Sequence, residues 1–562
     1  MAILGIDLGT TNSACAIWDG DKVQLIPNRL GEFLTPSVVG IDDKGLVTVG
    51  KVARDRLISH SDRTVAVFKR LMGSNHQVQL ARQRFTATEL SALVLKSLKE
   101  DAEAFLGQPV TEAVISVPAY FNDNQRQATR LAGELAGFKV ERLINEPTAA
   151  AIAYGLNQRA EGTFLILDLG GGTFDVSILE FFDGVMEVHA SAGDNFLGGE
   201  DFNNAIQEAL LAEQGITALD LSPQQRAQLA TAVERSKRRI GLPGDNRISL
   251  TLGKHQIDKQ IDDDWFTKLA TPLLLRAKRP IERALDDAKL NPGAIDEVVL
   301  VGGSTRMGLF RATVGRMFGR LPACHIDPDL AIAMGAAIQA GLKAKDAALG
   351  EIVLTDVCPY TLGTEVNGPD SKGGGYFMPI IERNSTVPVS VERSVVTAHD
   401  NQQVVRVAIY QGESRLVANN IHLGELELAV PPGPAGSQQV DIRYSYDMNG
   451  LLAVDVTVAS TGLKVNKVIE QAPGALSTAQ KAEALARLDK LKFHPRDQEE
   501  NRALLARGER VYQSSLGDQR EYVANVLGEF DKVLERQNPQ EIARLRAKVN
   551  EVLDKFDRDN WL

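Results

Sequence analysis

The chain has 562 residues, too many for one hydrophobic core, so we expect several domains. Hydrophobic residues make up 44% of the sequence and charged residues 24%, which is typical of a globular protein. The net charge of −11 comes from interspersed acidic and basic residues, which argues against nucleic acid or an anionic membrane as a partner.

Three cysteines, Cys15, Cys324 and Cys358, share no metal-ligand spacing, which favours a reducing compartment over a disulfide framework. The N-terminus has no basic segment and enters a strand directly, so no signal peptide is expected. No apolar run reaches the length needed to span a membrane. A cytoplasmic location is therefore predicted.

The same sequence phrase occurs twice. An apolar run over 3–8 leads into Asp7-Leu8-Gly9-Thr10-Thr11-Asn12, and a run over 163–167 leads into 168–175, which reads Asp-Leu-Gly-Gly-Gly-Thr-Phe-Asp. Glycines let the backbone turn with its N–H groups facing one concavity, which suits a polyphosphate. The flanking carboxylates would repel bare phosphate, so hydrated Mg²⁺ is expected between them.

A second pair of segments repeats in the same order. Residues 113–118 form a strand before a helical stretch, as residues 298–303 do, and Glu146 opens a small-residue helix, as residues 327–329 open another. An internal duplication is the simplest explanation of this order. It predicts two α/β lobes that face each other across a cleft, each contributing one aspartate-glycine turn to hold a nucleotide and its metal.

Residues 1–350 alternate between strands and helices, which predicts an α/β arrangement. The predicted helices cover 87–104, 125–136, 202–214, 223–239 and 266–289. Residues 351–356 (Glu-Ile-Val-Leu-Thr-Asp) are compatible with an edge strand and with a docking linker. The local pattern does not decide between these two.

The pattern changes after residue 357. Residues alternate between apolar and polar over 387–395, 404–410, 422–430, 440–445 and 452–458. Asn449-Gly450 forms a hairpin signal between the last two segments, so a compact antiparallel β domain is predicted. After Pro473 the pattern is helical. It fits a small bundle packed on itself as well as a helical cover over the β domain.

Three charged motifs have simple structural explanations. Lys69 has a basic neighbour, and most such lysines are solvated. Glu146 stands where a carboxylate favours the start of a helix. Glu234, Lys237 and Arg238 fall within about one turn of each other, as on a solvated helix face. From the residues alone, none of them requires a catalytic role.

Five phrases, taken together, resemble one family. They are 6–13, 117–121, 145–151, 167–175 and 299–307. In this order they are similar to the seventy-kilodalton heat-shock chaperones of the DnaK type, and the likeness runs from residue 1 to about residue 470. It implies an ATP-driven chaperone with an actin-like ATPase domain (1–350), an interdomain linker (351–356), a β-sandwich peptide-binding domain (357–471) and a short helical lid (472–562).

The resemblance also implies site residues. Asp7 and Asp168 would hold Mg²⁺ through waters, and Lys69 would orient the attacking water. The other catalytic residues would be Glu146, Thr173 and Asp175. The nucleotide-binding residues would be Thr10, Thr11, Asn12, Gly170, Gly171, Gly172, Glu234, Lys237, Arg238, Gly302, Gly303, Ser304, Arg306 and Asp329. The peptide site would include Val395, Ala398, Val405 and Val407, and the linker Val353, Leu354 and Asp356. The implied cofactors are ATP or ADP with Mg²⁺, and K⁺ as a further ion.

The partners that the resemblance implies are unfolded or extended client peptides and a J-domain cochaperone. The need for a nucleotide-exchange factor stays open. The lid is short, residues 371–376 resemble an inserted loop, and four positions depart from the family pattern: Gly241, Gly308, Thr355 and Thr364. These features are similar to the short-lid HscC type, for which faster exchange of peptide and nucleotide is expected.

Two other functions fit the duplicated lobes. One is a sugar or acetate kinase, and the other is a filament-forming, actin-like ATPase. Neither has an obvious use for the β domain and the lid. ATP hydrolysis that responds to peptides would favour the chaperone, whereas ATP-dependent sedimentation would favour the filament.

Overall fold

The computed structural model describes residues 2–42, 47–158, 161–182, 185–323, 325–344, 349, 353–367, 375–448 and 450–469. Between 501 and 559 it describes all residues except 502, 503, 506, 509, 510, 513, 514 and 516. The chain divides into two compact units, Met1–Pro359 and Tyr360–Leu562. No described helix is both long enough and apolar enough to cross a membrane.

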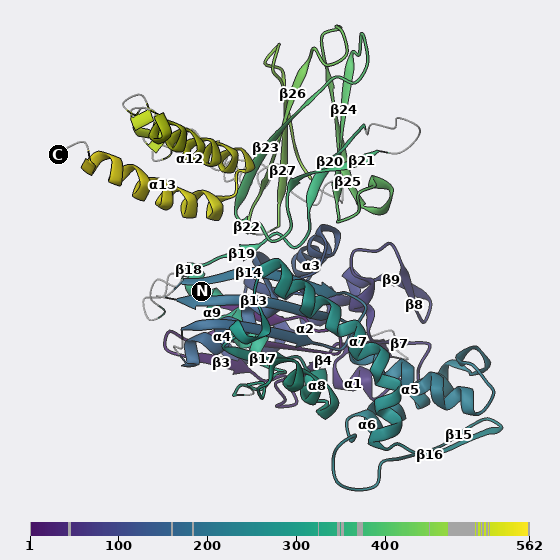
Figure 1. Ribbon diagram of the computed structural model, residues 1–562. Coiled ribbons are helices and arrows are strands. Elements are labelled where there is room, and N and C mark those ends of the chain that lie inside the picture. Colours follow the sequence, from purple (N-terminus) through teal and green to yellow (C-terminus); the bar gives the residue numbers. More distant parts are fainter. Residues whose placement is uncertain are drawn as a thin grey trace. The chain divides into compact units, whose positions relative to one another are not determined.

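The first lobe of the N-terminal unit is built on a six-stranded sheet, in which β11-β10-β1-β2-β3 lie side by side and β4 pairs with β2. Figure 1 labels β3 and β4 of this sheet. Its strands are β1 (Ile3–Asp7), β2 (Asn12–Trp18), β3 (Val23–Ile26), β4 (Thr35–Pro36), β10 (Glu112–Val117) and β11 (Lys139–Asn145). Helices α2 (Ala87–Leu106) and α3 (Asp123–Leu135) contribute to its core. The sheet therefore brings Asp7, at the end of β1, to the same edge as the end of β11.

The second lobe repeats this pattern in a five-stranded sheet with the order β17-β12-β13-β14-β18. Its strands are β12 (Gly162–Leu169), β13 (Phe174–Phe182), β14 (Val185–Asp194), β17 (Glu297–Val301) and β18 (Val353–Leu354). β10 runs parallel to β1, and β17 runs parallel to β12. On the other side, β2 is antiparallel to β1 and β3 to β2, just as β13 is antiparallel to β12 and β14 to β13. The equal order and direction confirm the predicted duplication and the α/β class of this part.

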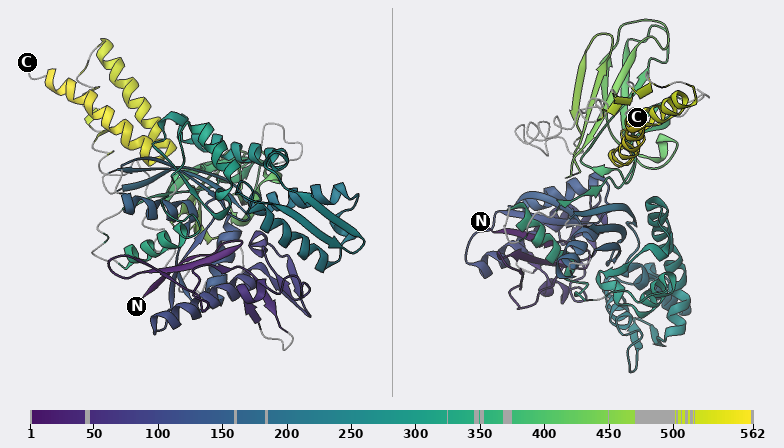
Figure 2. Two further views of the ribbon diagram at one scale, coloured as in Figure 1. Left: turned by 90° about the horizontal axis from the view of Figure 1, so that it is seen from below. Right: turned by 60° about the vertical axis from the view of Figure 1, so that its left-hand side comes forward.

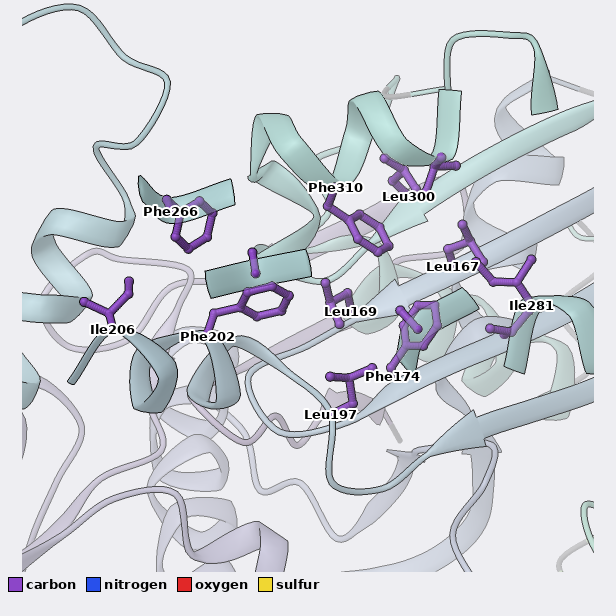
Figure 3. Close-up of a cluster of buried hydrophobic side chains, with 14 of the residues drawn as sticks. Leu167, Leu169, Phe174, Leu197, Phe202, Ile206, Phe266, Ile281, Leu300 and Phe310 are labelled. Carbon is purple, nitrogen blue, oxygen red and sulfur yellow. The ribbon is translucent and has the colours of Figure 1, made fainter. Parts of the chain in front are cut away.

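The core of the second lobe lies between its sheet and four helices. These are α5 (Gly199–Glu213), α6 (Pro223–Lys237), α7 (Asp263–Ala288) and α8 (Gly308–Phe318). Figure 3 shows Phe174 on the sheet facing Phe310 on α8, with ring centroids 6.0 Å apart and planes at 84°. This edge-to-face packing holds the strand that follows the second aspartate-glycine turn.

Several small elements complete the N-terminal unit. They are β5 (Val39–Ile41), β6 (Val47–Val49), β7 (Thr64–Val65), β8 (Gln77–Leu80), β9 (Gln83–Thr86), β15 (Arg247–Leu252), β16 (His255–Gln260), β19 (Asp356–Val357) and α1 (Lys51–Arg54). Helix α7 starts three residues before its predicted beginning because Asp262 caps it, accepting a hydrogen bond from Trp265 N.

Two small-residue helices connect the lobes. Helix α4 (Glu146–Gln158) packs on the second sheet, and α9 (Ala331–Lys343) packs on the first. They approach so closely that a Cβ on Gly335 would lie 1.7 Å from the carbonyl oxygen of Ala149. The glycine is therefore required by contact between helices, and this contact fixes where α4 begins.

The C-terminal unit contains two four-stranded antiparallel sheets. One has the order β21-β20-β24-β25 and the other β23-β26-β27-β28. The strands of these sheets are β20 (Leu362–Val366), β21 (Tyr376–Ile381), β23 (Val389–Val396), β24 (Val404–Gln411), β25 (Ile421–Ala429), β26 (Gln439–Tyr446), β27 (Leu452–Val458) and β28 (Lys464–Val468). The short strand β22 (Thr386–Val387) belongs to neither sheet. The predicted β class and the hairpin between β26 and β27 are confirmed, although Asn449 lies outside the described residues. Strands β20, β21 and β28 were not predicted, because they lack clear alternation.

Helices α12 (Gly517–Arg536) and α13 (Pro539–Asp559) lie side by side in both views of Figure 2 and share a core that includes Phe530 and Leu553. Asn538 caps α13, accepting hydrogen bonds from Gln540 N and Glu541 N. The Gln537 side chain also exchanges two hydrogen bonds of 3.0 Å with the backbone of Glu392 on β23. The helices thus pack on each other and also attach to the β-sandwich through polar contacts.

The contact between α4 and α9 yields a stability prediction. Gly335→Ala should lower the free energy of unfolding of the N-terminal unit by about 1–3 kcal/mol, because the added methyl group forces the helices apart. Gly308→Ala is the matched control, since a Cβ there meets nothing within 4 Å. Thermal unfolding measures both. Equal stability of the two variants would contradict the proposed close contact.

Candidate functional site

The two aspartate-glycine turns meet in one cavity of about 330 Å³ in the N-terminal unit. The predicted residues that line it are Asp7, Thr10, Thr11, Asn12, Lys69, Glu146, Asp168, Gly170, Gly171, Thr173, Glu234, Lys237, Arg238, Gly302, Gly303, Ser304, Arg306 and Asp329. Two predicted residues, Gly172 and Asp175, do not line it. Asp175 is fully buried opposite Asp168 in the β12–β13 pair and accepts a hydrogen bond from Tyr120 N at 2.9 Å.

The two turns touch each other. A Cβ on Gly171 would lie 2.0 Å from Thr11 Oγ1, and one on Gly172 would lie 2.9 Å from Thr10 Oγ1. Glycine is therefore needed because the turns come together, in addition to any need for backbone freedom. The start of α5 supports the second turn: Gly199 N and Glu200 N donate to the carbonyls of Gly170 and Gly171 at 2.9 Å.

Three carboxylates that line the cavity, Asp7, Glu146 and Asp168, lie close to the buried Asp175. Burial, reinforced by repulsion from Glu146, raises the pKa of Asp7 to about 7, although Lys69 and a hydrogen bond from Ser116 act in the opposite direction. Burial and Glu146 likewise raise the pKa of Asp175 to about 7 and that of Asp168 well above its usual value. The cluster carries more negative than positive charge, so a bound cation would stabilise its ionised form.

The chemistry of these oxygens fits a hard cation. Asp168 Oδ2 and Asp175 Oδ2 are buried and have no hydrogen-bond partner among the described residues. Among the residues that the structure describes, no group of three or more His, Cys, Asp or Glu side chains is arranged to hold a metal. This arrangement suits Mg²⁺, which dehydrates reluctantly and keeps several waters when one or two carboxylates bind it.

Lys69 is buried, so the solvated explanation of this residue is wrong. Only 3% of its side chain is exposed, and Nζ lies 2.9 Å from Glu146 Oε1. It belongs to a short 3₁₀ turn, Phe68–Leu71, whose Phe68 packs in the core of the first lobe. Because Glu146 is the first residue of α4, the start of that helix sets the position of the ammonium group.

Three charged residues at the C-terminal end of α6 also line the cavity. Lys237 is buried, donates to the carbonyl of Gly199 at 3.0 Å and pairs with Glu234 at 2.8 Å, whereas Arg238 is exposed. Ser304 Oγ donates to the carbonyl of Gly170 at 2.9 Å, and Arg306 pairs with Asp329 at 2.9 Å. The bond of Ser304 connects the second turn to the adjoining wall of the cavity.

Sequence reasoning missed part of the lining. The missed residues are Gly9, Leu34, Gly199, Glu200, Ile240, Met307, Pro328 and Ile332. A signal existed for Gly199 and Glu200, because glycines between a strand and a helix are typical of an anion site at a helix N-terminus. No comparable signal marked the apolar residues, which reach the cavity through tertiary packing.

Residues 353–357 form an edge strand and a buried contact in the N-terminal unit. β18 pairs in parallel with β14, matching Val353 with Val185 and Leu354 with Met186. Asp356 is buried and accepts a hydrogen bond from Asn145 Nδ2 at 2.8 Å. Val353 and Leu354 thus form an edge strand of the second sheet, and the docking-linker alternative stays open. Residues 351 and 352 lie outside the described part.

The predicted peptide-site residues lie on β23, on β24 and just beyond β23. Val405 and Val407 are buried, Val395 is half-buried and Ala398 is exposed. Thr364, which departs from the family pattern, is buried and donates to the carbonyl of Ala408 at 2.8 Å. Its hydroxyl is therefore satisfied within the sandwich. Most of the suspected insertion, residues 371–374, lies outside the described residues.

Comparison with known proteins gives one consistent result. Residues 3–561 match the model of the family described as Hsp70 protein. The chain is 43% identical over 481 residues to the chaperone protein DnaK of Thermosipho melanesiensis, which covers 83% of this chain and 80% of that relative. It is also 43% identical over 481 residues to the chaperone protein DnaK of Thermosipho africanus, covering 83% and 79%.

The raised pKa of Asp175 predicts a pH effect in protein freed of metal and nucleotide. Its pKa lies near 7 in the folded state against an ordinary value of 3.8, so the folded state binds more protons between these values. Stability should therefore fall as pH rises through this window. Asp175→Asn should raise the melting temperature at pH 8 and change it little at pH 5.

Asp19→Asn serves as the control for this experiment. Asp19 is exposed, and backbone hydrogen bonds lower its pKa, so its replacement should not alter the slope above pH 5. Melting curves in EDTA from pH 5 to 8 provide the measurement. An Asp175→Asn variant that is less stable than wild type at pH 8 would show that the carboxylate is not destabilised by burial.

Proposed function

Because the chain belongs to the Hsp70 protein family, whose members are ATP-driven chaperones and ATPases, we propose that it couples Mg-ATP hydrolysis to the binding and release of short, extended apolar peptides. The observation that carries the proposal is the burial of Lys69 in one cavity with both aspartate-glycine turns. The family match does not favour a sugar kinase or a filament-forming protein.

In the proposed site, Asp7 and Asp168 hold hydrated Mg²⁺, and the backbone of the two turns binds the phosphates. Bound Mg²⁺ would neutralise charge on the phosphate oxygens. Lys69 orients the attacking water and stabilises charge that develops on the γ-phosphate, while Glu146 fixes the ammonium group. Thr173 and Asp175 assist, and K⁺ is a further ion that the carboxylates would accept.

The adenosine moiety is assigned to the wall beyond the phosphate turns. The residues proposed to bind it are Glu234, Lys237, Arg238, Gly302, Gly303, Ser304, Arg306 and Asp329. The missed apolar residues Ile240 and Met307 line the same cavity and offer an apolar surface to a purine ring. Gly241 lies beside Ile240 in the left-handed region at φ +78°.

The proposed coupling runs through the linker. Asp356 accepts a hydrogen bond from Asn145, and Asn145 directly precedes Glu146, the partner of Lys69. Docking of the linker and the geometry of the catalytic lysine are thus joined by adjacent residues. The coupling must be reciprocal: if bound nucleotide weakens the binding of peptide, bound peptide weakens the binding of nucleotide by the same factor.

We further propose the division into 1–350, 351–356, 357–471 and 472–562, and a peptide site that contains Val395, Ala398, Val405 and Val407. Burying one peptide leucine there would contribute about 1.5–3 kcal/mol, with strand-like hydrogen bonds to the peptide backbone adding register. A J-domain cochaperone is the expected partner, and the cytoplasm is the expected compartment.

The first functional prediction concerns Lys69. The wild-type protein should hydrolyse ATP slowly with Mg²⁺, and some short apolar peptides should raise the rate. Lys69→Ala should reduce hydrolysis at least about 10²-fold, because it removes charge stabilisation at the phosphoryl group. Steady-state phosphate release provides the measurement. Lys259→Ala, which removes an exposed ion pair with Glu213, is the control and should hydrolyse normally.

A second prediction concerns the linker. Asp356→Ala should retain basal ATP hydrolysis but lose most of the stimulation by peptide, because the linker loses its bond to Asn145. Phosphate release with and without a stimulating peptide tests this. If stimulation is unchanged, residues 351–356 do not transmit the signal.

A further inference from the structure

Arg70 follows the catalytic lysine and points in a different direction. The turn Phe68–Leu71 belongs to the first lobe, yet the Arg70 guanidinium forms an ion pair with Asp201 of α5 in the second lobe. Phe68 and Phe202 are buried in the cores of the two separate lobes, so this pair crosses the cleft. Lys69 binds within its own lobe through Glu146, and its neighbour binds the opposite lobe.

From this geometry we propose that Arg70 is a positioning residue for ATP hydrolysis. Its ion pair with Asp201 clamps the segment that carries Lys69 onto the second phosphate turn. The inference rests on the proposed function, since it assigns a role in the same reaction. It adds a contact between the lobes that holds the segment of the catalytic lysine.

The Asp201 end of the clamp is bonded to the phosphate turn. Asp201 Oδ2 accepts Gly198 N at 2.8 Å, in addition to Arg70. The two residues after Gly198 donate their N–H groups to the carbonyls of the second turn. A displacement of Asp201 would therefore be transmitted directly to the backbone that is proposed to bind phosphate.

The Arg70 end lies against the same turn. A Cβ on Gly172 would be 2.9 Å from Arg70 Nε, and this Nε is buried without a hydrogen-bond partner among the described residues. The side chains of Arg70 and Asp201 are only 17% and 18% exposed. A shielded pair of this kind is screened less by solvent than a surface pair, so it can hold two lobes together.

The backbone before Lys69 is strained. Val67 has φ +60° and ψ +16°, a left-handed conformation that is a genuine outlier for a β-branched residue. Such strain persists only where surrounding contacts impose it, and it occurs often at functional sites. The contacts that hold this turn are the packing of Phe68 in the core of the first lobe and the bonds of Lys69 to Glu146 and of Arg70 to Asp201. Loss of the bond between Arg70 and Asp201 should let the turn relax and displace the lysine.

Single-turnover ATP hydrolysis and nucleotide affinity, measured on the full chain, test this proposal. Arg70→Ala should lower the hydrolysis rate about 10²-fold, as expected for a misplaced catalytic group, with ATP affinity nearly unchanged. Arg70→Lys should retain more activity, because it keeps the charge. The double variant Arg70→Asp with Asp201→Arg should recover part of the rate that Arg70→Asp alone loses.

The control is Arg276→Ala. Arg276 binds Asp194 at 2.6 and 2.7 Å, but both residues belong to the second lobe, so this ion pair does not cross the cleft. This variant should hydrolyse ATP at the wild-type rate. If Arg70→Ala does not fold, the proposal is tested by the hydrolysis rate of Arg70→Lys and by the rate recovered in the double variant.

Three results would overturn the inference. These are an Arg70→Ala variant as active as wild type, a loss of rate explained entirely by weaker ATP binding, and an equal loss in Arg276→Ala. Wild-type protein without any ATPase activity would overturn the proposed function together with this inference. Active wild type, inactive Lys69→Ala and fully active Arg70→Ala would overturn the inference alone.

Discussion

The repulsion among Asp7, Glu146, Asp168 and Asp175 is the constraint on which the N-terminal unit depends. These carboxylates are buried close to the ammonium group of Lys69, and burial raises the pKa of the three aspartates. Such a cluster does not assemble through its own interactions. The surrounding sheets and helices must hold the carboxylates together. A ligand that carries cations is then bound more favourably, because the negative charge is already in position.

The duplicated architecture supplies the required rigidity. Each lobe ends a central strand at an aspartate and follows it with a glycine turn, so two similar units present the same chemistry to one cavity. Helices α4 and α9 cross between the lobes with backbone contact at Gly335. Because α4 begins at Glu146, the packing of small residues in the interior sets the position of the carboxylate that holds the lysine. Packing between the helices thus sets the position of Glu146 and, through it, that of Lys69.

The start of α4 also connects the cavity to the segment 353–357, since Asn145 binds Asp356 and Glu146 binds Lys69. In the C-terminal unit, polar contacts have a different role. Gln537 and the β23 backbone form a limited set of hydrogen bonds, whereas α12 and α13 bury their own apolar core. A net hydrogen bond contributes about 1 kcal/mol, less than one buried leucine or phenylalanine. The stability of the helical pair therefore comes from its own core.

The sequence by itself determined the fold class, the duplication, both aspartate-glycine turns and, through its resemblance to a family, most of the cavity lining. Local signals sufficed because strand alternation, glycine turns and helix caps depend on neighbours in the chain. Only the tertiary structure decided that Lys69 is buried, that residues 353–354 form an edge strand and that Arg70 reaches across to Asp201. Apolar lining residues such as Ile240 and Met307 were also beyond prediction. Each of these features joins residues far apart in the sequence, and a contact of that kind is set by packing between elements rather than by local pattern.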